Sequence, residues 1–332
     1  MKLDINLRVL FSALFLILLT STIYPTNSNA QTPSETGERG STDECGGNGT
    51  AIITDPVDTS CELQPDSQKI NFLRVDLCTE EPTAPTTSAV LDRSNCSTFF
   101  RNVDGSEVTV QQGAGTQIGE LSDYSALPHG TYNYGVVTMG TVFKYTASVT
   151  FSDTMTDTSG TGGTTTCVTR PGSNAIMYGY YQDQNAAQSN VSCTTNAVAS
   201  EISIGINTLA MVDNINCRHL LNFNGTNGIV AAYLLEADDT LHDDVPDTDI
   251  VPASSSGCTS GTNNEVSKIM GVMTLATPIK IGANTARIQI KYNNTRSLKI
   301  DLANTSSIYK WDIAFFDFTL TAVPKRTKGT IR

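Results

Sequence analysis

Short runs of alternating apolar and polar residues follow most of this chain, and they predict β-strands. Between residues 70 and 78 successive side chains alternate between two faces of an expected strand. One face has Ile70, Phe72, Arg74 and Asp76, and the other has Asn71, Leu73, Val75 and Leu77. The segment 127–151 begins with a turn at Pro128 and Gly130 and continues in the same alternation. A strand with one side toward a core accounts for this period of two.

Further strand patterns recur along the rest of the chain, at 106–111, 175–181, 197–206, 228–236, 265–275, 286–292, 297–302 and 309–323. A Thr/Gly-rich loop is expected at 152–166, and 293–296 (NNTR) is expected to form a hairpin turn. Only 211–221 offers a short helical period, with Val212, Ile215 and His219 on one face. Many short strands with regular turn signals predict an all-β protein, an antiparallel β-sandwich.

The last strand pattern, WDIAFFDFTLTAV, carries a prediction about the core. Phe316, Phe318 and Leu320 share an uninterrupted apolar side, whereas Phe315 shares its side with Asp317. We therefore expect Phe318 and Phe316 to lie between the sheets and Phe315 to matter less. Trp311, the only tryptophan, is also expected in the core.

The first thirty residues have the organisation of a secretory signal peptide. Lys2 and Arg8 precede an apolar run from Val9 to Leu19, and Ser28 and Ala30 place small residues before an expected cleavage at Gln31. The run is about half of the ~20 residues that span a bilayer. A secreted or cell-surface location follows, with the periplasm as the alternative for a bacterial host.

The charge of the chain excludes some partners. The full sequence has 21 basic and 33 acidic residues; without Lys2, Arg8 and Asp4 of the leader, 19 and 32 remain, a net charge of −13. Nucleic acids and anionic membranes select basic surfaces, so neither is an expected partner. Other surface proteins, further copies of the chain or glycans are the expected partners.

All eight cysteines follow the leader and are expected to form four disulfides. An even number in an oxidising compartment, without any CxxC pair, favours bridges over zinc. Sequential pairing is the simplest arrangement, with Cys78–Cys96 its most secure pair. The cysteines are Cys45, Cys61, Cys78, Cys96, Cys167, Cys193, Cys217 and Cys258.

Composition divides the chain into four parts. Residues 1–30 are the leader and 31–65 a flexible, cysteine-containing segment rich in Gly, Ser and Thr. The β-sandwich region spans 66–324, with a division into two subdomains near 152–166 as an option, and 325–332 is a basic tail.

No local signature of catalysis is present in the sequence. The three histidines, His129, His219 and His242, lie in neither an HExxH motif nor beside a GxSxG elbow. A hydrolase with a site assembled from distant loops is therefore only the third hypothesis, since such sites are recognised by geometry.

An acidic run at 236–249 is the one candidate metal site. Calcium prefers six to eight oxygen ligands, but the spacing departs from the EF-hand loop, and a solvated acidic loop is the favoured interpretation. No other cofactor is expected. The candidate ligands are Asp238, Asp239, Asp243, Asp244, Asp247 and Asp249.

Tyrosines offer a candidate glycan site. Tyr178, Tyr180 and Tyr181 lie close to amide side chains in MYGYYQDQN, and Tyr132 and Tyr134 are expected on one face of a strand. Tyrosine is also an ordinary strand residue. Six Asn-x-Ser/Thr sequons are candidate surface acceptors in a eukaryotic host, at Asn48, Asn95, Asn190, Asn224, Asn293 and Asn304.

Two segments resemble bacterial extracellular sandwich domains. LPHGTYNYGVV is similar to the strand entry of transthyretin-like or immunoglobulin-like surface domains, and TPIKIGANTARIQIKYNNTRSLKIDL resembles paired strands of such domains. The resemblance implies a sandwich used for display, adhesion or assembly, without catalytic residues. The leading hypothesis is therefore a secreted or surface protein of structural or adhesive function; a glycan-binding module is the alternative.

Overall fold

The computed structural model describes most of the chain beyond residue 60. The described residues are 19–20, 43–44, 50–51, 60–110, 115–157, 160–172, 177–178, 190–206, 212–213, 218–225, 228–242, 266–304, 307–314 and 317–325. They form β-sheets whose strands pair mostly antiparallel. The helical element among the described residues is one 3-10 turn, η1 (Leu121–Asp123). No described helix has the length and apolar character needed to cross a membrane.

The largest sheet has ten strands in the order β12-β14-β9-β5-β8-β18-β17-β16-β15, with β6 also paired to β5. Its pairs are antiparallel except for β12 with β14. The strands are β5 (Ser67–Cys78), β6 (Cys96–Val110), β8 (Gly130–Gly140), β9 (Val142–Thr146), β12 (Met177–Tyr178), β14 (Ile202–Gly205), β15 (Val212–Asp213), β16 (Arg218–Gly225), β17 (Gly228–Leu235) and β18 (Lys268–Ile281).

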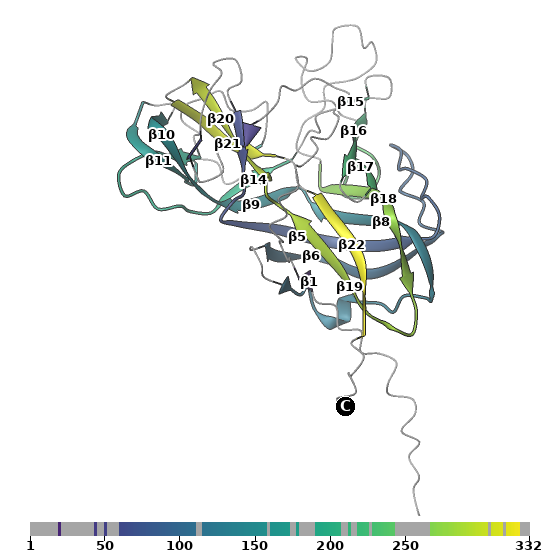
Figure 1. Ribbon diagram of the computed structural model, residues 1–332. Coiled ribbons are helices and arrows are strands. Elements are labelled where there is room, and N and C mark those ends of the chain that lie inside the picture. The colour runs from purple at the N-terminus through teal and green to yellow at the C-terminus, as the bar shows by residue number, and fades with distance from the viewer. Residues whose placement is uncertain are drawn as a thin grey trace, which may run out of the picture.

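A second sheet of eight strands adjoins it (Figure 1), and two pairs complete the fold. The eight strands are β2 (Asp43–Glu44), β3 (Thr50–Ala51), β4 (Ser60–Leu63), β10 (Ser148–Asp157), β11 (Gly162–Thr169), β13 (Val191–Ser192), β20 (Leu298–Asn304) and β21 (Ser307–Ile313). The two pairs are β19 (Thr285–Asn293) with β22 (Asp317–Pro324), and β1 (Leu19–Thr20) with β7 (Gly115–Thr116).

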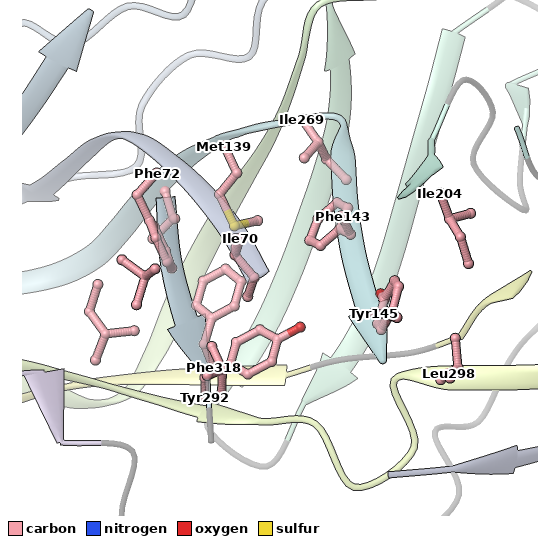
Figure 2. Close-up of a cluster of buried hydrophobic side chains, with 14 of the residues drawn as sticks. Ile70, Phe72, Met139, Phe143, Tyr145, Ile204, Ile269, Tyr292, Leu298 and Phe318 are labelled. Atoms are coloured by element: carbon pink, nitrogen blue, oxygen red, sulfur yellow. The ribbon is translucent and has the colours of Figure 1, made fainter. Parts of the chain in front are cut away.

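The main core lies where the β19–β22 pair crosses one face of the large sheet (Figure 1). Figure 2 shows side chains of β5, β8, β9 and β18 converging with Tyr292 of β19 and Phe318 of β22. Glycine at 135 permits the close approach of β22, since a Cβ atom there would lie 2.5 Å from Leu320 Cδ1. The opposite face of this sheet is called the outer face below.

A buried polar network fixes the junction of three strands inside this core. Gln68 of β5 donates hydrogen bonds to the hydroxyls of Tyr145 (3.1 Å) and Tyr292 (2.9 Å), and Ser297 donates to Gln68 Oε1 (3.1 Å). Burial raises the pKa of both phenols, so they stay neutral. Each polar group in this dry position therefore has a partner, as burial requires.

A β-bulge near Leu73 changes the predicted faces of β5. The register slips between Phe72 and Arg74 against both β6 and β8. Ile70 and Phe72 face the core before the slip, and Val75 and Leu77 face it afterwards. Neither side predicted from strict alternation is thus uniform along the strand, because one extra residue exchanges the two faces.

The C-terminal strands differ from the sequence prediction in their partners. The turn at 294–297 forms, with Ser297 N bonded to Asn294 O, but it joins β19 to a strand of the other sheet and is not a hairpin turn. The run 309–323 is likewise divided between β21 and β22. Trp311 and Phe318 are buried as predicted, whereas Phe315 and Phe316 lie outside the described residues.

Two other local predictions were wrong. The expected loop at 152–166 is largely a hairpin, since β10 and β11 pair across it; β-branched threonine suits strands as well as loops. The expected helical face at 211–221 instead begins the antiparallel pair of β15 and β16. A window of eleven residues carries too few periods to separate helix from strand.

We predict that Gly162→Ala is far more damaging than Gly163→Ala. Both residues have positive φ, +129° and +101°, which strains any L side chain. At 162 a Cβ would also lie 2.9 Å from the Cys193 carbonyl oxygen, whereas no atom lies within 4 Å of a Cβ at 163. Urea unfolding should show a loss of roughly 3 kcal/mol for the first and about 1 kcal/mol for the second; equal losses would contradict this packing.

Candidate functional site: the outer face of the large sheet

Residues 79–95 form a strap that crosses the outer face. Its ends are joined by the disulfide Cys78–Cys96 (S–S 2.01 Å), whose cysteines are directly opposite in the β5–β6 pair. Leu91 of the strap packs in a second apolar cluster with Val136, Met270 and other outer-face side chains. The strap is thereby fixed to the sheet at both ends and along its underside.

A buried ion cluster fixes the C-terminal part of the strap. Asp76 is fully buried and accepts hydrogen bonds from Arg74 Nε (2.9 and 2.8 Å), Arg93 Nε (3.2 Å) and Thr98 Oγ1 (2.5 Å). Arg93 also donates to Met270 Sδ (3.5 Å). Burial, and then the positive charge of Arg74, lower the pKa of Arg93. Two arginines and a hydroxyl donor together offset the cost of burying this carboxylate.

A shallow cleft of about 420 Å³ opens beside the strap. Its lining combines apolar side chains, among them Tyr233 and Val272, with polar side chains, Glu81, Thr83 and Thr274. It is lined by Glu81, Pro82, Thr83, Ala84, Ala231, Tyr233, Val272 and Thr274. Apolar contact and hydrogen bonding are the two kinds of interaction that small-ligand sites provide, and both kinds of group are present here.

The described half of the acidic run forms a tight turn at 236–242. Asp239 forms an ion pair with Lys268 (2.7 Å), and Asp238 accepts hydrogen bonds from the backbone N–H (3.0 Å) and hydroxyl (2.6 Å) of Thr240, which lower its pKa. Glu236 contacts Nδ1 of the buried His242. Leu241 N donates to Thr86 O, so the turn also supports the strap.

The calcium hypothesis is restricted by these contacts. Asp238 and Asp239 have different protein partners, and the described residues include no group of three potential metal ligands. Asp243, Asp244, Asp247 and Asp249 lie outside the described residues. Calcium binding by the run stays a prediction.

We expect a direct thermal test to decide the calcium question. An ion that binds the native state in preference to the unfolded state raises the melting temperature of the protein by mass action. If the run binds calcium, EDTA should lower the melting temperature and millimolar calcium should restore it. Identical melting curves in both solutions would leave only a solvated acidic loop.

The tyrosines do not form the platform that the sequence suggested at 132–134. Tyr132 is buried in the main core, with its hydroxyl donated to Pro128 O, while Tyr134 packs against the outer cluster. The two therefore lie on opposite faces. Tyr178 is in β12, its side chain not among the described ones, and Tyr180 and Tyr181 lie outside the described residues.

The cysteine prediction is confirmed for two bridges. Cys78–Cys96 and Cys167–Cys193 are disulfides between sequential cysteines. Cys45, Cys217 and Cys258 lie outside the described residues, as does the side chain of Cys61 in β4.

One predicted glycosylation site is wrong. Asn190 is fully buried, and its amide donates to the backbone carbonyl of Trp311 (3.2 Å) and accepts from the backbone N–H of the same residue (2.8 Å). Asn95 and Asn293 are exposed, whereas the side chains of Asn48, Asn224 and Asn304 are not among those described. A sequon carries no information on burial, which is why the sequence did not separate them.

The histidines occupy unrelated positions. His129 is exposed in the turn before β8, and His242 is fully buried at the end of the 236–242 turn. His219 is in β16, and its side chain is not among the described ones.

The ion cluster of Asp76 was not predicted from the sequence. The sequence does contain a signal for this cluster. Arg74 and Asp76 are charged residues within the apolar run FLRVDLC, and because they are two residues apart in a strand they lie on the same face. Arg93 was not predictable, because its contact depends on the path of the strap.

Comparisons with known proteins found no matching family model, curated protein or solved structure.

Proposed function

We propose that this chain is a secreted or cell-surface structural or adhesive protein that acts through surface contacts. In this proposal its sheets form a sandwich of the immunoglobulin-like or transthyretin-like class. The strap carries the proposal, because a disulfide, an ion cluster and an apolar underside hold it on an otherwise accessible sheet face. A preorganised surface of this kind loses little entropy when it binds.

The two disulfides support secretion. Such bridges form and persist in oxidising compartments and are rare in the cytosol. Together with the leader at 1–30, they favour export of the chain.

A glycan-binding module is the second candidate, favoured by the cleft beside the strap. Its volume of about 420 Å³ lies within the roughly 300–1,000 Å³ of small-ligand pockets, and its lining includes Tyr233 as an aromatic side chain and Thr83 and Thr274 as polar ones, the residue types that contact sugars.

The cleft can be tested by filling it. Purified secreted chain is examined for self-association by analytical ultracentrifugation and for sugar binding on a glycan array. Thr274→Trp places an indole in the cleft, and Val103→Trp, at a position 75% exposed on β6, is the matched control. Loss of association or binding with the first variant alone supports the cleft as a contact site. A wild-type chain that stays monomeric and binds no glycan would contradict the proposal.

A further inference from the structure

The side of the β19–β22 pair that points away from the main core carries mostly polar and basic side chains. Ile288, Ile290 and Tyr292 of β19 face the core. The residues that alternate with them point the other way, together with their direct partners on β22. These outward residues, called the basic strip below, are Arg287, Gln289 and Lys291 of β19 and Thr319, Thr321 and Val323 of β22.

The basic strip is covered although it points away from the core. Gln289 is 7% exposed, and Nε of Arg287 is buried without a hydrogen-bond partner among the described residues. The other members of the strip are half-buried. A buried donor without an acceptor costs free energy. The cover that hides Arg287 in this structure is therefore poorly matched to it.

A segment of the expected leader lies against β19. β1 (Leu19–Thr20) falls within residues 1–30, and it is held by its pairing with β7. After β22, it makes the most extensive backbone contact with β19 among the described strands. The expected cleavage before Gln31 removes this neighbour of β19 from the mature chain.

Charge favours an acidic partner for the strip. Arg287 and Lys291 are its charged members, and the nearest acidic position in the register is Asp317, opposite Asn293 at one end. The chain as a whole has a net charge of −12, and its acidic run at 236–249 holds seven carboxylates without a lysine or arginine. A second copy of the chain therefore brings a segment of complementary charge.

We propose that removal of the leader opens the basic strip and that the acidic run of a second copy docks on it. The inference rests on the surface-contact function proposed above and names a further copy of this chain as the partner. Carboxylates of the run provide Arg287 with the acceptor that it lacks in the uncleaved chain. Strip and run are different surfaces of one chain, so the contact is head-to-tail and builds rings or open filaments.

Sedimentation velocity of the secreted, leader-free chain tests the contact. Species larger than a dimer should form, and they should weaken as salt is added, because salt screens exposed charges. Arg287→Glu should weaken association at least about tenfold, the effect expected when a charge-assisted contact is lost. Arg170→Glu, at an exposed arginine outside the strip, is the matched control and should change nothing. Equal losses in the two variants would overturn the proposal.

A mixing experiment tests the head-to-tail direction. The run-neutral variant keeps the described turn at 236–242 and combines Asp243→Asn, Asp244→Asn, Asp247→Asn and Asp249→Asn. This variant and Arg287→Glu should each stay monomeric alone, since each lacks one half of the contact. Mixed in equal amounts they should form dimers and nothing larger, because only one intact strip and one intact run can meet. A monomeric mixture, or a run-neutral variant that associates like the wild-type chain, would contradict the proposal.

A peptide tests the part played by the leader. A synthetic peptide of residues 17–30 should inhibit association of the mature chain by occupying the strip, whereas the same residues in scrambled order should not. If neither peptide inhibits, or both inhibit equally, the leader does not cover the strip and the proposal is wrong.

Failure of this proposal is distinguishable from failure of the proposed function. Association or glycan binding that Thr274→Trp abolishes and Arg287→Glu leaves intact would retain the proposed function and reject docking on the strip. A chain that stays monomeric and binds no glycan would reject both.

Discussion

Replacing Asp76 with asparagine should lower the free energy of unfolding by about 3–5 kcal/mol, the range for breaking a buried ion pair. The variant keeps the shape of the side chain but removes its charge, so Arg74 and Arg93 would face each other without a neutralising carboxylate. Urea unfolding, monitored by tryptophan fluorescence, measures the change. Asp104→Asn is the control, because Asp104 is exposed on β6 and such changes usually stay within about 0.5 kcal/mol.

A double variant tests the mechanism of that loss. Arg93→Met replaces the second arginine with an apolar side chain suited to its site beside Met270. If repulsion between the arginines causes the loss, Asp76→Asn should cost at least about 1 kcal/mol less in the Arg93→Met background. Strictly additive losses would show that the two residues are uncoupled and that the cluster is incorrectly assigned.

Phe318→Ala should cost about 3–5 kcal/mol, the usual range for a buried phenylalanine. Phe318 is 7% exposed and its ring reaches Gly271 of β18, so truncation leaves a cavity between β22 and the large sheet. Val103→Ala, at an exposed position, is the control and should change stability little. Urea midpoints of the two variants decide the comparison.

The sequence also predicts an order among the neighbouring phenylalanines. Phe316→Ala should resemble Phe318→Ala, and Phe315→Ala should cost less, if the strand pattern extends through 315–318. If Phe315→Ala proved the most damaging of the three, the assignment of Phe316 and Phe318 to one core-facing side and of Phe315 to the other would be wrong.

Strands were predictable from this sequence because their signal is local. The pattern at 228–236 gives β17 almost at its observed bounds, and the pattern at 127–151 covers β8, β9 and the start of β10 without showing where one strand ends and the next begins. The bulge in β5 was not predictable, since it is a property of the register between three strands. Partners of β19 and β20 were likewise missed, because a turn specifies a change of direction and not the sheet in which the next strand lies.

The candidate site divides in the same way. Arg74 and Asp76 were within reach of a pattern argument, whereas Arg93 and the lining of the cleft come together only through strands and a strap distant in sequence. Cys78–Cys96 was predicted correctly because its loop is short and its first cysteine ends a strand. The choice among distant partners depends on tertiary packing, to which single-sequence patterns are blind.

The covalent closure of the strap has a consequence for how the protein responds to proteolysis. Its tip, Thr86–Ala89, is exposed, which is where proteases cleave most readily. A cut there would leave two polypeptides joined by Cys78–Cys96, with Leu91 and Arg93 still attached to the sheet. A nicked molecule would therefore migrate as intact on a non-reducing gel, and only reduction would release the two fragments.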